Sequence, residues 1–420
     1  MAEAMRPYIT LLPALIFPVL TVHVQAAPLR SFEAPPHSYW EKAPQDAFSA
    51  WLSKQPPDAG GVPAPASEKE AVQRLLKRLN IPESSQMLVF SATSLQRSIS
   101  PYRPRALFFN DEIYLAWVPD GRVEIAADDP ELGPVFFIMS LSAPYTQPLV
   151  ADRQTRCMNC HAPPETGGLP SLLLTSTLPN DDGGSLDKFR EPEVGHGVPF
   201  EQRFGGWHVT GIDARKVPHA NVIGQSADGK TVRVPNAPGE RGDLRHYPRP
   251  TSDILPQLIL EHQSGAVNLL TRAHYLARSL TSPEHGPLTS DDTAAADRMA
   301  ADIASYFLFA NEAALPPGGI AGDAEFKRDF TANRRPDSQN RALKDLSLST
   351  HLFSYRCSYV IYLPLFTALP AQMKDRVWSA MEQALGPQPA AAGKHLPPGE
   401  RAAIRSILVA TAKDVPASWK

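Results

Sequence analysis

Cys157, Cys160 and His161 are the residues of this chain whose types and spacing most clearly indicate chemistry, because they form the run Cys-x-x-Cys-His. Two thiols at this spacing reach the two vinyl groups along one edge of a porphyrin and form thioethers there. The histidine that follows then lies under the ring, where its imidazole binds the iron as the proximal ligand. The pattern therefore predicts one covalently attached haem c, with Cys157 and Cys160 as attachment residues and His161 as iron ligand.

Two other chemistries use cysteines at this spacing. Adjacent cysteine and histidine do not easily share one tetrahedral zinc ion, and the chain has no second Cys-x-x-Cys to complete such a site. A thiol–disulfide exchange motif lies in a βαβ pattern, which the sequence around Cys157 lacks. Haem attachment is favoured over both. Cys357, the third cysteine, is interpreted as a small buried apolar residue.

The composition is that of a globular protein, and its charge does not favour a polyanion as partner. The 420 residues are 43% hydrophobic and 20% charged, with a formal net charge of −3, and no long basic run occurs. Nucleic acid is therefore not an expected partner. The 43 prolines predict long ordered loops between short elements.

Residues 1–26 have the pattern of a signal peptide. Arg6 precedes an apolar run over residues 9–24, and Ala26 and Ala27 suit cleavage between them. The run is short for a membrane span, so no stable span is expected after cleavage. Covalent haem attachment takes place outside the cytoplasm, and the expected location is the periplasm. The export signal therefore agrees with the haem prediction.

The elements that must position the motif are predicted to form an α+β fold. Residues 27–85 are a Pro- and Ala-rich segment with a helix, for which Ser67 and Glu70 resemble a capping box. Residues 86–250 are predicted to form a small antiparallel β meander followed by a loop-rich haem c segment. Residues 251–420 are mainly helical and are expected to pack on the haem region.

Within these regions, apolar spacing and turn residues define the expected elements. Strands are expected in the apolar runs at residues 87–90, 106–109, 113–118, 123–126 and 135–138. Helices are expected over residues 46–52, 67–81, 253–280, 291–314, 371–385 and 398–412, with a loop between 316 and 337. Residues 358–366 are apolar and fit either a strand or a buried helix.

The second axial ligand of the iron is sought among histidines and methionines. No methionine lies between His161 and Met299, which argues against the ordinary small cytochrome c domain. His262 is the first choice for the distal position, because it falls on the apolar stripe of the long helix and a buried imidazole needs a partner. A core histidine bonded to a neighbour is the structural alternative. His208, an open site without a protein ligand, His274 and Met299 remain further possibilities.

Arginines commonly neutralise the carboxylates of a haem. Arg103, Arg105 and Arg203 are candidates for that role, although each is more often simply a solvated charge. The sequence does not choose among them.

Three classes of haem protein fit these residues. The first is a single-haem c-type cytochrome that transfers one electron at a time. The others are a haem c enzyme of peroxidase or oxidoreductase type and a haem-based sensor with an open distal site. One haem needs far less than this chain length, which favours a docking surface, a substrate pocket or a sensory role. The redox partner and any substrate are not identified by the sequence.

The chain resembles a poorly characterised family of exported bacterial single-haem cytochrome c-like proteins, from about residue 88 to the C-terminus. The resemblance implies haem c binding and electron transfer, with assigned roles only for Cys157, Cys160 and His161. Where family members often have an aromatic residue this chain has His208, which weighs against a ligand role for it. The matching segments are the haem motif and residues 104–110, 203–211, 261–263, 268–273 and 357–362.

Overall fold

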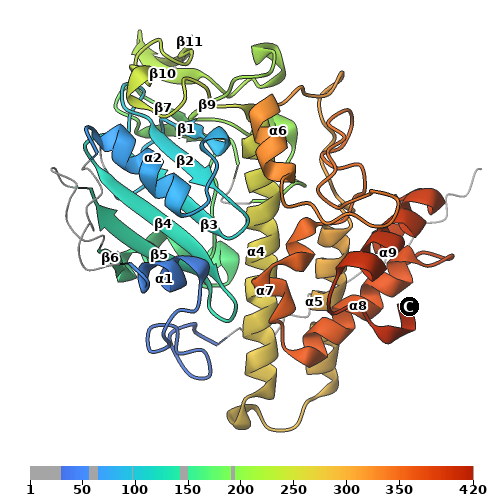
Figure 1. Ribbon diagram of the computed structural model, residues 1–420. Helices are drawn as coiled ribbons and strands as arrows, with labels where there is room; N and C mark the ends of the chain where they lie inside the picture. The colour runs from blue at the N-terminus through green and yellow to red at the C-terminus, as the bar shows by residue number, and fades with distance from the viewer. Residues whose placement is uncertain (1–29, 56–64, 97, 142–149, 191–193, 420) are drawn as a thin grey trace, which may run out of the picture.

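The computed structural model describes residues 30–55, 65–96, 98–141, 150–190 and 194–419, and the predicted signal peptide lies outside them. The protein combines antiparallel sheets with a helical C-terminal region (Figure 1). One continuous apolar cluster runs through both parts, from Phe32 to Trp419. Within the described residues, no helix is long and apolar enough to cross a membrane.

A seven-stranded antiparallel sheet carries the motif-bearing half of the molecule, in the order β6-β5-β4-β3-β2-β1-β9. Five consecutive strands form the predicted meander, which is thereby confirmed: β1 (Met87–Val89), β2 (Arg105–Phe109), β3 (Ile113–Trp117), β4 (Arg122–Asp129) and β5 (Gly133–Ser140). β6 (Ala151–Arg153) extends the sheet beside β5 and is followed closely by the Cys157–His161 motif. At the other edge, β9 (Trp207–His208) pairs with β1 from far along the chain.

Two short helices cover one face of the sheet, as Figure 1 shows. α1 (Ala47–Leu52) is capped by Asp46 and packs through Phe48, whose ring centroid lies 5.0 Å from that of Phe137. α2 (Glu68–Arg78) begins where Ser67 accepts a hydrogen bond from the Glu70 amide. The Glu70 carboxylate accepts from the Ala66 amide, so the capping is one residue off the reciprocal box.

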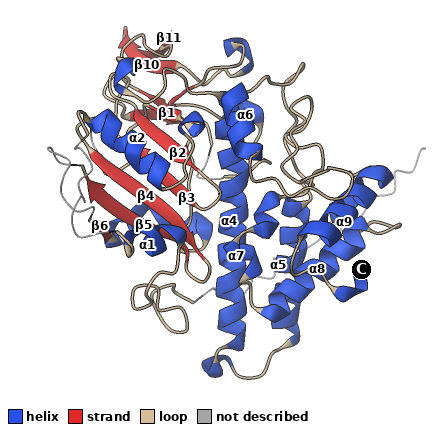
Figure 2. Cartoon of the chain, viewed as in Figure 1, coloured by secondary structure: helices blue, strands red, loops and turns tan. Residues whose placement is uncertain are grey.

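α4 (Ile254–Thr281) is the long helix at the centre of the molecule, with the sheet on one side and the other C-terminal helices on the opposite side (Figure 2). The predicted helices at the C-terminal end are confirmed as α5 (Ser290–Phe307), α8 (Ala371–Leu385) and α9 (Pro398–Thr411). α5 ends earlier than predicted because Phe309 adopts a left-handed backbone, φ 58°. Residues 358–366 take the helical alternative, as a 3₁₀ turn (Tyr359–Tyr362) followed by α7 (Pro364–Thr367).

The loop prediction for residues 316–337 is wrong, because this segment contains α6 (Ala324–Thr331). Asp323 caps the helix by accepting a hydrogen bond from the Phe326 amide at 2.8 Å. Only Phe326 and Phe330 are buried on it, one turn apart. A helix this short shows a single apolar repeat, which is too little for the sequence pattern to reveal.

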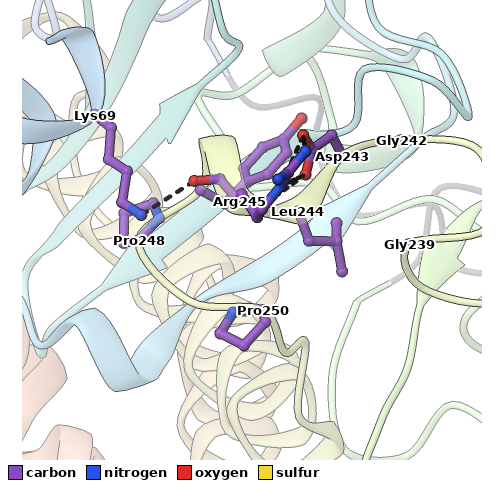
Figure 3. A pocket seen from close by; sticks show the side chains of 9 residues that line it. Lys69, Gly239, Gly242, Asp243, Leu244, Arg245, Pro248 and Pro250 are labelled. Carbon is purple, nitrogen blue, oxygen red and sulfur yellow. Dashed lines mark hydrogen bonds and ion pairs between the residues drawn. The ribbon is translucent and has the colours of Figure 1, made fainter.

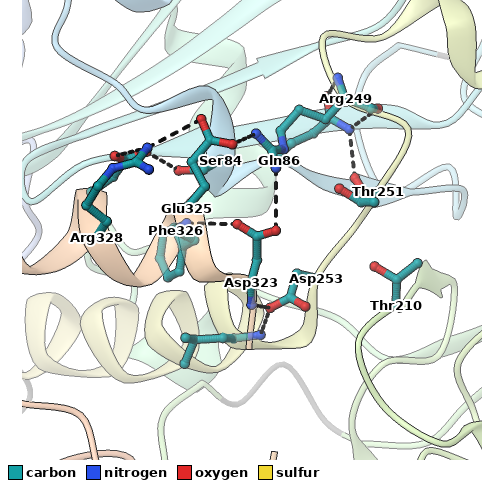
Figure 4. A network of polar contacts seen from close by, with 12 residues as sticks. Ser84, Gln86, Thr210, Arg249, Thr251, Asp253, Asp323, Glu325, Phe326 and Arg328 are labelled. Atoms are coloured by element: carbon teal, nitrogen blue, oxygen red, sulfur yellow. Dashed lines mark hydrogen bonds and ion pairs between the residues drawn. The ribbon is translucent and has the colours of Figure 1, made fainter. Parts of the chain in front are cut away.

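A polar network fixes the first turn of α4 against α6 and the sheet (Figure 4). Asp253 caps α4 through the Leu255 amide, and the same carboxylate oxygen accepts from the Asp323 amide, each at 3.0 Å. Arg249 pairs with Glu325 at 2.6 Å, and the Gln86 side chain donates to the Arg249 carbonyl at 2.7 Å. The start of α4 is thus tied to both neighbours.

The loop-rich region after the motif contains two small hairpins of its own. β7 (Thr177–Pro179) pairs with β8 (Ser185–Lys188), and β10 (Val222–Ala227) pairs with β11 (Lys230–Pro235). Between them Gly206 turns the chain into β9 with φ 81°, where a Cβ would lie 2.7 Å from Ser91. Glycine at this position therefore allows the tight turn into the strand.

Candidate functional site

The three motif residues lie on one short helical turn. α3 spans Met158–His161, and Cys157 before it already has helical angles, φ −61° and ψ −33°. Positions three and four apart share a helix face, so Cys157 lies beside both Cys160 and His161. Met158 is buried, whereas Cys157 is half-buried, Cys160 is exposed, and both thiols are free. The turn is therefore anchored through Met158 and leaves Cys160 exposed.

His161 is held by reciprocal hydrogen bonds to Ser171. Its Nδ1 lies 2.9 Å from the Ser171 carbonyl oxygen, while the Ser171 amide donates to the His161 carbonyl at 2.8 Å. Because a carbonyl only accepts, Nδ1 carries the proton and Nε2 has the lone pair. Burial lowers the pKa of His161; the Ser171 hydrogen bond and the Glu124 carboxylate oppose this effect, and the Arg105 guanidinium adds to it. The imidazole is thus neutral, and Nε2 makes no hydrogen bond to any described residue.

Asn268 on α4 fixes the segment that holds His161. Its side-chain oxygen accepts from the Leu172 amide and its side-chain nitrogen donates to the Leu172 carbonyl, both at 2.8 Å. Leu172 follows Ser171 directly, so these two hydrogen bonds position the Ser171 carbonyl, which orients the His161 imidazole. The central helix α4 therefore supports the motif indirectly, through Leu172 and Ser171.

We expect Asn268→Ala to lower the free energy of unfolding by about 1–3 kcal/mol, because it leaves both backbone groups of Leu172 without partners. Chemical denaturation of the full chain measures this loss. Arg272→Ala is the matched control, since Arg272 is exposed one turn further along α4. Equal free energies of unfolding for the two variants would show that the hydrogen bonds between Asn268 and Leu172 contribute nothing to stability.

A half-exposed apolar face of the sheet adjoins the motif. The Phe136 ring centroid lies 4.2 Å from that of His161. Side chains alternate along strands, so the pairing of Ile138 with Glu124 places both on the same face as Phe136. The same register continues across β3 to Leu107 on β2. Leu107 and Ile138 are only half-buried although they belong to interior strands.

An ion pair stands on this face. Arg105 Nη1 lies 3.0 Å from Glu124 Oε2, and the Ser94 hydroxyl donates to Glu124 Oε1 at 2.6 Å. The two side chains are 14% and 22% exposed. Burial, and then the Glu124 carboxylate, raise the pKa of Cys157 to about 11, so this thiol is protonated at neutral pH.

His262 lies in a different environment, deep in the helical layer. It is fully buried, with Nδ1 2.8 Å from His196 Nδ1 and Nε2 2.9 Å from the Ser358 hydroxyl. Burial lowers its pKa to about 3, so the ring is neutral. Aromatic rings from Tyr306, Phe309, Phe353 and Tyr359 surround it.

The structure does not bring His262 and His161 into contact. Both ring nitrogens of His262 are engaged within the protein, and its ring neighbours differ from Phe136, the neighbour of His161. Ligation of an iron by His262 stays a prediction, and it requires at least one of these hydrogen bonds to break.

The other distal candidates are also buried residues. His208 is buried beside Phe90, with Nδ1 3.4 Å from the Asn221 side-chain oxygen. His274 Nε2 lies 2.7 Å from the Leu365 carbonyl oxygen, and Met299 is buried on α5.

Of the three arginine candidates, only Arg105 stands on the sheet face that carries Leu107. Arg103 is 44% exposed and pairs with Asp120 at 3.5 Å. Arg203 is buried and donates to the backbone carbonyls of Val198 and His196. The structure thus separates candidates that the sequence left equivalent.

A buried acid lies behind the segment that carries His196. Glu312 is followed by Ala313, whose amide donates to the His196 carbonyl, and its own Oε1 accepts from the Leu352 amide at 2.9 Å. Its Oε2 lies 3.2 Å from His351 Nδ1 but makes no hydrogen bond. Burial raises the pKa of Glu312 to about 7.

This raised pKa predicts a pH dependence of stability. The folded protein binds the Glu312 proton more tightly than the unfolded chain, so the contribution is present below pH ~4.5 and is lost as pH rises through about 7. Denaturation curves recorded from pH 4 to 8 should show a smaller decline for Glu312→Gln than for the wild type. Parallel pH profiles of the two proteins would contradict the assignment.

One surface pocket of about 430 Å³ lies elsewhere, beside the start of α2 (Figure 3). Its basic side chains are already engaged. Lys69 donates to the Arg245 carbonyl at 3.1 Å, and Arg245 grips Asp243 through Nε and Nη2. These contacts hold both basic side chains against the pocket wall.

Sequence reasoning missed Ser171 and Asn268, which orient His161. Neither belongs to the motif, and the Asn268–Leu172 contact spans 96 residues. Asn268 falls in a segment of the family resemblance, which was the one available signal. In the described part of the chain, no group of three or more His, Cys, Asp or Glu side chains could hold a metal ion.

No family model matches the chain, and no significant match is found among curated proteins or solved structures. The proposed function is therefore argued from the residues and their geometry.

Proposed function

We propose that the protein is an exported, periplasmic single-haem c-type cytochrome that transfers one electron at a time. Cys157 and Cys160 would hold the haem as thioethers, and His161 would bind its iron from the proximal side. Haem c, when bound, supplies an iron that cycles between two oxidation states. The partner that gives or takes the electron is a redox protein of unknown identity.

The observation that carries this proposal is the state of His161. A metal-binding imidazole needs one nitrogen free and the other hydrogen-bonded, since the second bond fixes the tautomer and the ring orientation. The Ser171 carbonyl accepts from Nδ1, and burial keeps the ring neutral, which leaves the Nε2 lone pair available. Two free thiols on the same helical turn complete the set.

The surroundings of the motif suit a large flat apolar group. Phe136 packs against His161, and Leu107 and Ile138 are half-exposed on the same sheet face. Covering such side chains stabilises a complex by about 25 cal/mol per Å² of apolar surface removed from water. The face therefore provides apolar contacts for the cofactor that the thiols would attach.

A second candidate function, binding of a small ligand at an open distal side, is favoured by one observation. Both ring nitrogens of His262 are engaged within the protein, so the first choice for the distal ligand is not free to bind iron. An open iron position is the feature shared by haem sensors and haem enzymes. This candidate keeps the same attachment residues and the same proximal ligand.

The test is the optical spectrum of the purified full-length protein, made with a c-type haem maturation system. We expect a haemochrome spectrum in pyridine that corresponds to one haem attached by two thioethers. Absence of covalent haem would refute the proposal. Carbon monoxide added to the reduced protein then separates the two candidates: a spectral shift indicates an open distal site, and no shift indicates a second protein ligand and plain electron transfer.

A further inference from the structure

We propose that strand β11 joins two copies of this chain by pairing with β11 of the second copy across a two-fold axis. The pairing would turn two β10–β11 hairpins into one four-stranded antiparallel sheet. Figure 1 shows β11 at the top of the molecule, where β10 is the one strand hydrogen-bonded to it among the described residues. No residue of the haem motif takes part, so this surface is independent of the proposed function.

The turn of the hairpin determines which backbone groups of β11 face outward. Asp228 and Gly229 have φ 50° and 72°, as a type I′ turn of two residues requires. Ala227 and Lys230, which flank this turn, therefore share two hydrogen bonds. Along an antiparallel pair, such bonded positions alternate with non-bonded ones. From Lys230 onward, every second residue of β11 thus bonds to β10, and the residues between them turn their backbone groups away.

Thr231 and Arg233 are the outward residues. Neither their N–H groups nor their carbonyl oxygens make a hydrogen bond to another residue in the described parts of the chain. Both residues are exposed, so a further strand can reach all four groups. A row of unpaired backbone groups on an edge strand is a template for pairing with another strand. β11 therefore offers a short ladder of two residues.

The neighbours of β11 limit the length of this ladder and leave it open. Pro235 has no N–H, and its carbonyl accepts from Arg241 Nη1 at 3.0 Å, which closes that end. A charged side chain commonly guards an edge strand. The Arg233 guanidinium, however, lies 4.8 Å from the Phe189 ring centroid, and its Nη2 is 2.8 Å from His219 Nδ1. Its charge is thus held beside these two rings and does not cover the edge.

One antiparallel register satisfies both outward residues and keeps like charges apart. In it, Thr231 of each copy lies opposite Arg233 of the other, and four hydrogen bonds join the two edges. The next register in one direction places Arg233 opposite Arg233 of the second copy, where like charges destabilise the pair. The next register in the other direction places Arg233 opposite Gly229 in the turn. The favoured register is therefore the symmetric one between Thr231 and Arg233.

This register places Val232 of both copies on the two-fold axis. Val232 is apolar but 39% exposed in the single chain. Opposite residues of a non-bonded pair bring their side chains closest together, so the two valines would cover each other. The same patch then serves both copies, as a two-fold interface requires. Four hydrogen bonds and one valine pair make a small contact, so we expect a weak dimer that depends on protein concentration.

Sedimentation of the full chain at low to high micromolar concentration tests the proposal. The wild type should shift from monomer to dimer as the concentration rises. Thr231→Pro should dimerise about tenfold or more weakly, because proline removes an outward N–H but no bond to β10. Thr231→Val keeps this N–H and should dimerise like the wild type. A wild type that stays monomeric, or a Thr231→Pro protein that dimerises as tightly, would overturn the proposal.

Val232→Cys tests the position of the axis. Its two copies would bring their Cβ atoms to about 4.5 Å, which is within the reach of a disulfide. Mild oxidation should therefore give a covalent dimer that mass spectrometry maps to β11. Lys230→Cys is the matched control, since Lys230 is exposed on the same strand but its two copies would lie about 13 Å apart.

Wild-type protein oxidised in parallel measures any linkage through Cys160, the exposed native thiol. Above that baseline, the Val232→Cys variant alone should cross-link. Cross-linking of Lys230→Cys as readily as Val232→Cys, or of neither, would overturn the two-fold pairing.

Discussion

Replacing Cys157 and Cys160 together by alanine is expected to abolish covalent haem attachment completely. Each thiol forms one of the two bonds to the porphyrin edge, and the half-exposed apolar face by itself provides only contacts. Haem staining after denaturing electrophoresis and the intact mass of the protein measure the result. The single variants should each retain at most one thioether, which shifts the pyridine haemochrome band.

Cys357→Ala is the matched control for this prediction. Cys357 is fully buried, so its thiol is not accessible to the vinyl group of a haem. It should leave the amount of attached haem unchanged. Covalent haem in the Cys157→Ala/Cys160→Ala protein, or its loss in Cys357→Ala, would contradict the assignment of the attachment residues.

His262→Ala is expected to lower the free energy of unfolding by about 3 kcal/mol or more. The change opens a cavity in the helical layer and leaves the buried His196 ring and the Ser358 hydroxyl without a shared partner. Denaturant titration of the full chain measures the loss. His274→Ala is the matched control, because His274 is buried on the same helix but makes one side-chain hydrogen bond, to the Leu365 carbonyl.

The haem spectrum of the same variants decides the distal ligand. If His262 binds iron, then both His262→Ala and the better-tolerated His262→Gln change the spin state, while His274→Ala does not. If His262 is a core residue, as its two hydrogen bonds indicate, all three spectra match the wild type. A stability loss no greater than about 0.5 kcal/mol in His262→Ala would contradict the structural role.

Local patterns in the sequence were sufficient for the elements. Alternating apolar runs separated by turn residues predicted strands β1 to β5, and helical spacing predicted α4, α8 and α9. These features depend on residues close together in the chain, where periodicity and capping act directly. The sequence pattern did not predict the short α6, because only Phe326 and Phe330 are buried on it.

The motif predicted the attachment residues and the proximal ligand, since covalent chemistry fixes their spacing within five consecutive positions. Only the tertiary structure shows which other residues position them. Ser171 orients His161, and Asn268 holds the segment from the central helix, through contacts that leave no local pattern. The same is true of β9, whose residues Trp207 and His208 pair with Val89 and Leu88 of β1, far away in the sequence.

Residues that the sequence left equivalent were separated by burial and partners. The apolar stripe placed His262 in the core, but only the fold shows that His196 and Ser358 already occupy its two nitrogens. Likewise, Arg103, Arg105 and Arg203 differ by environment and not by type. A sequence determines which groups are available for chemistry, whereas long-range packing determines which of them keep a nitrogen without a hydrogen-bond partner, and among the histidine candidates compared here His161 keeps its Nε2.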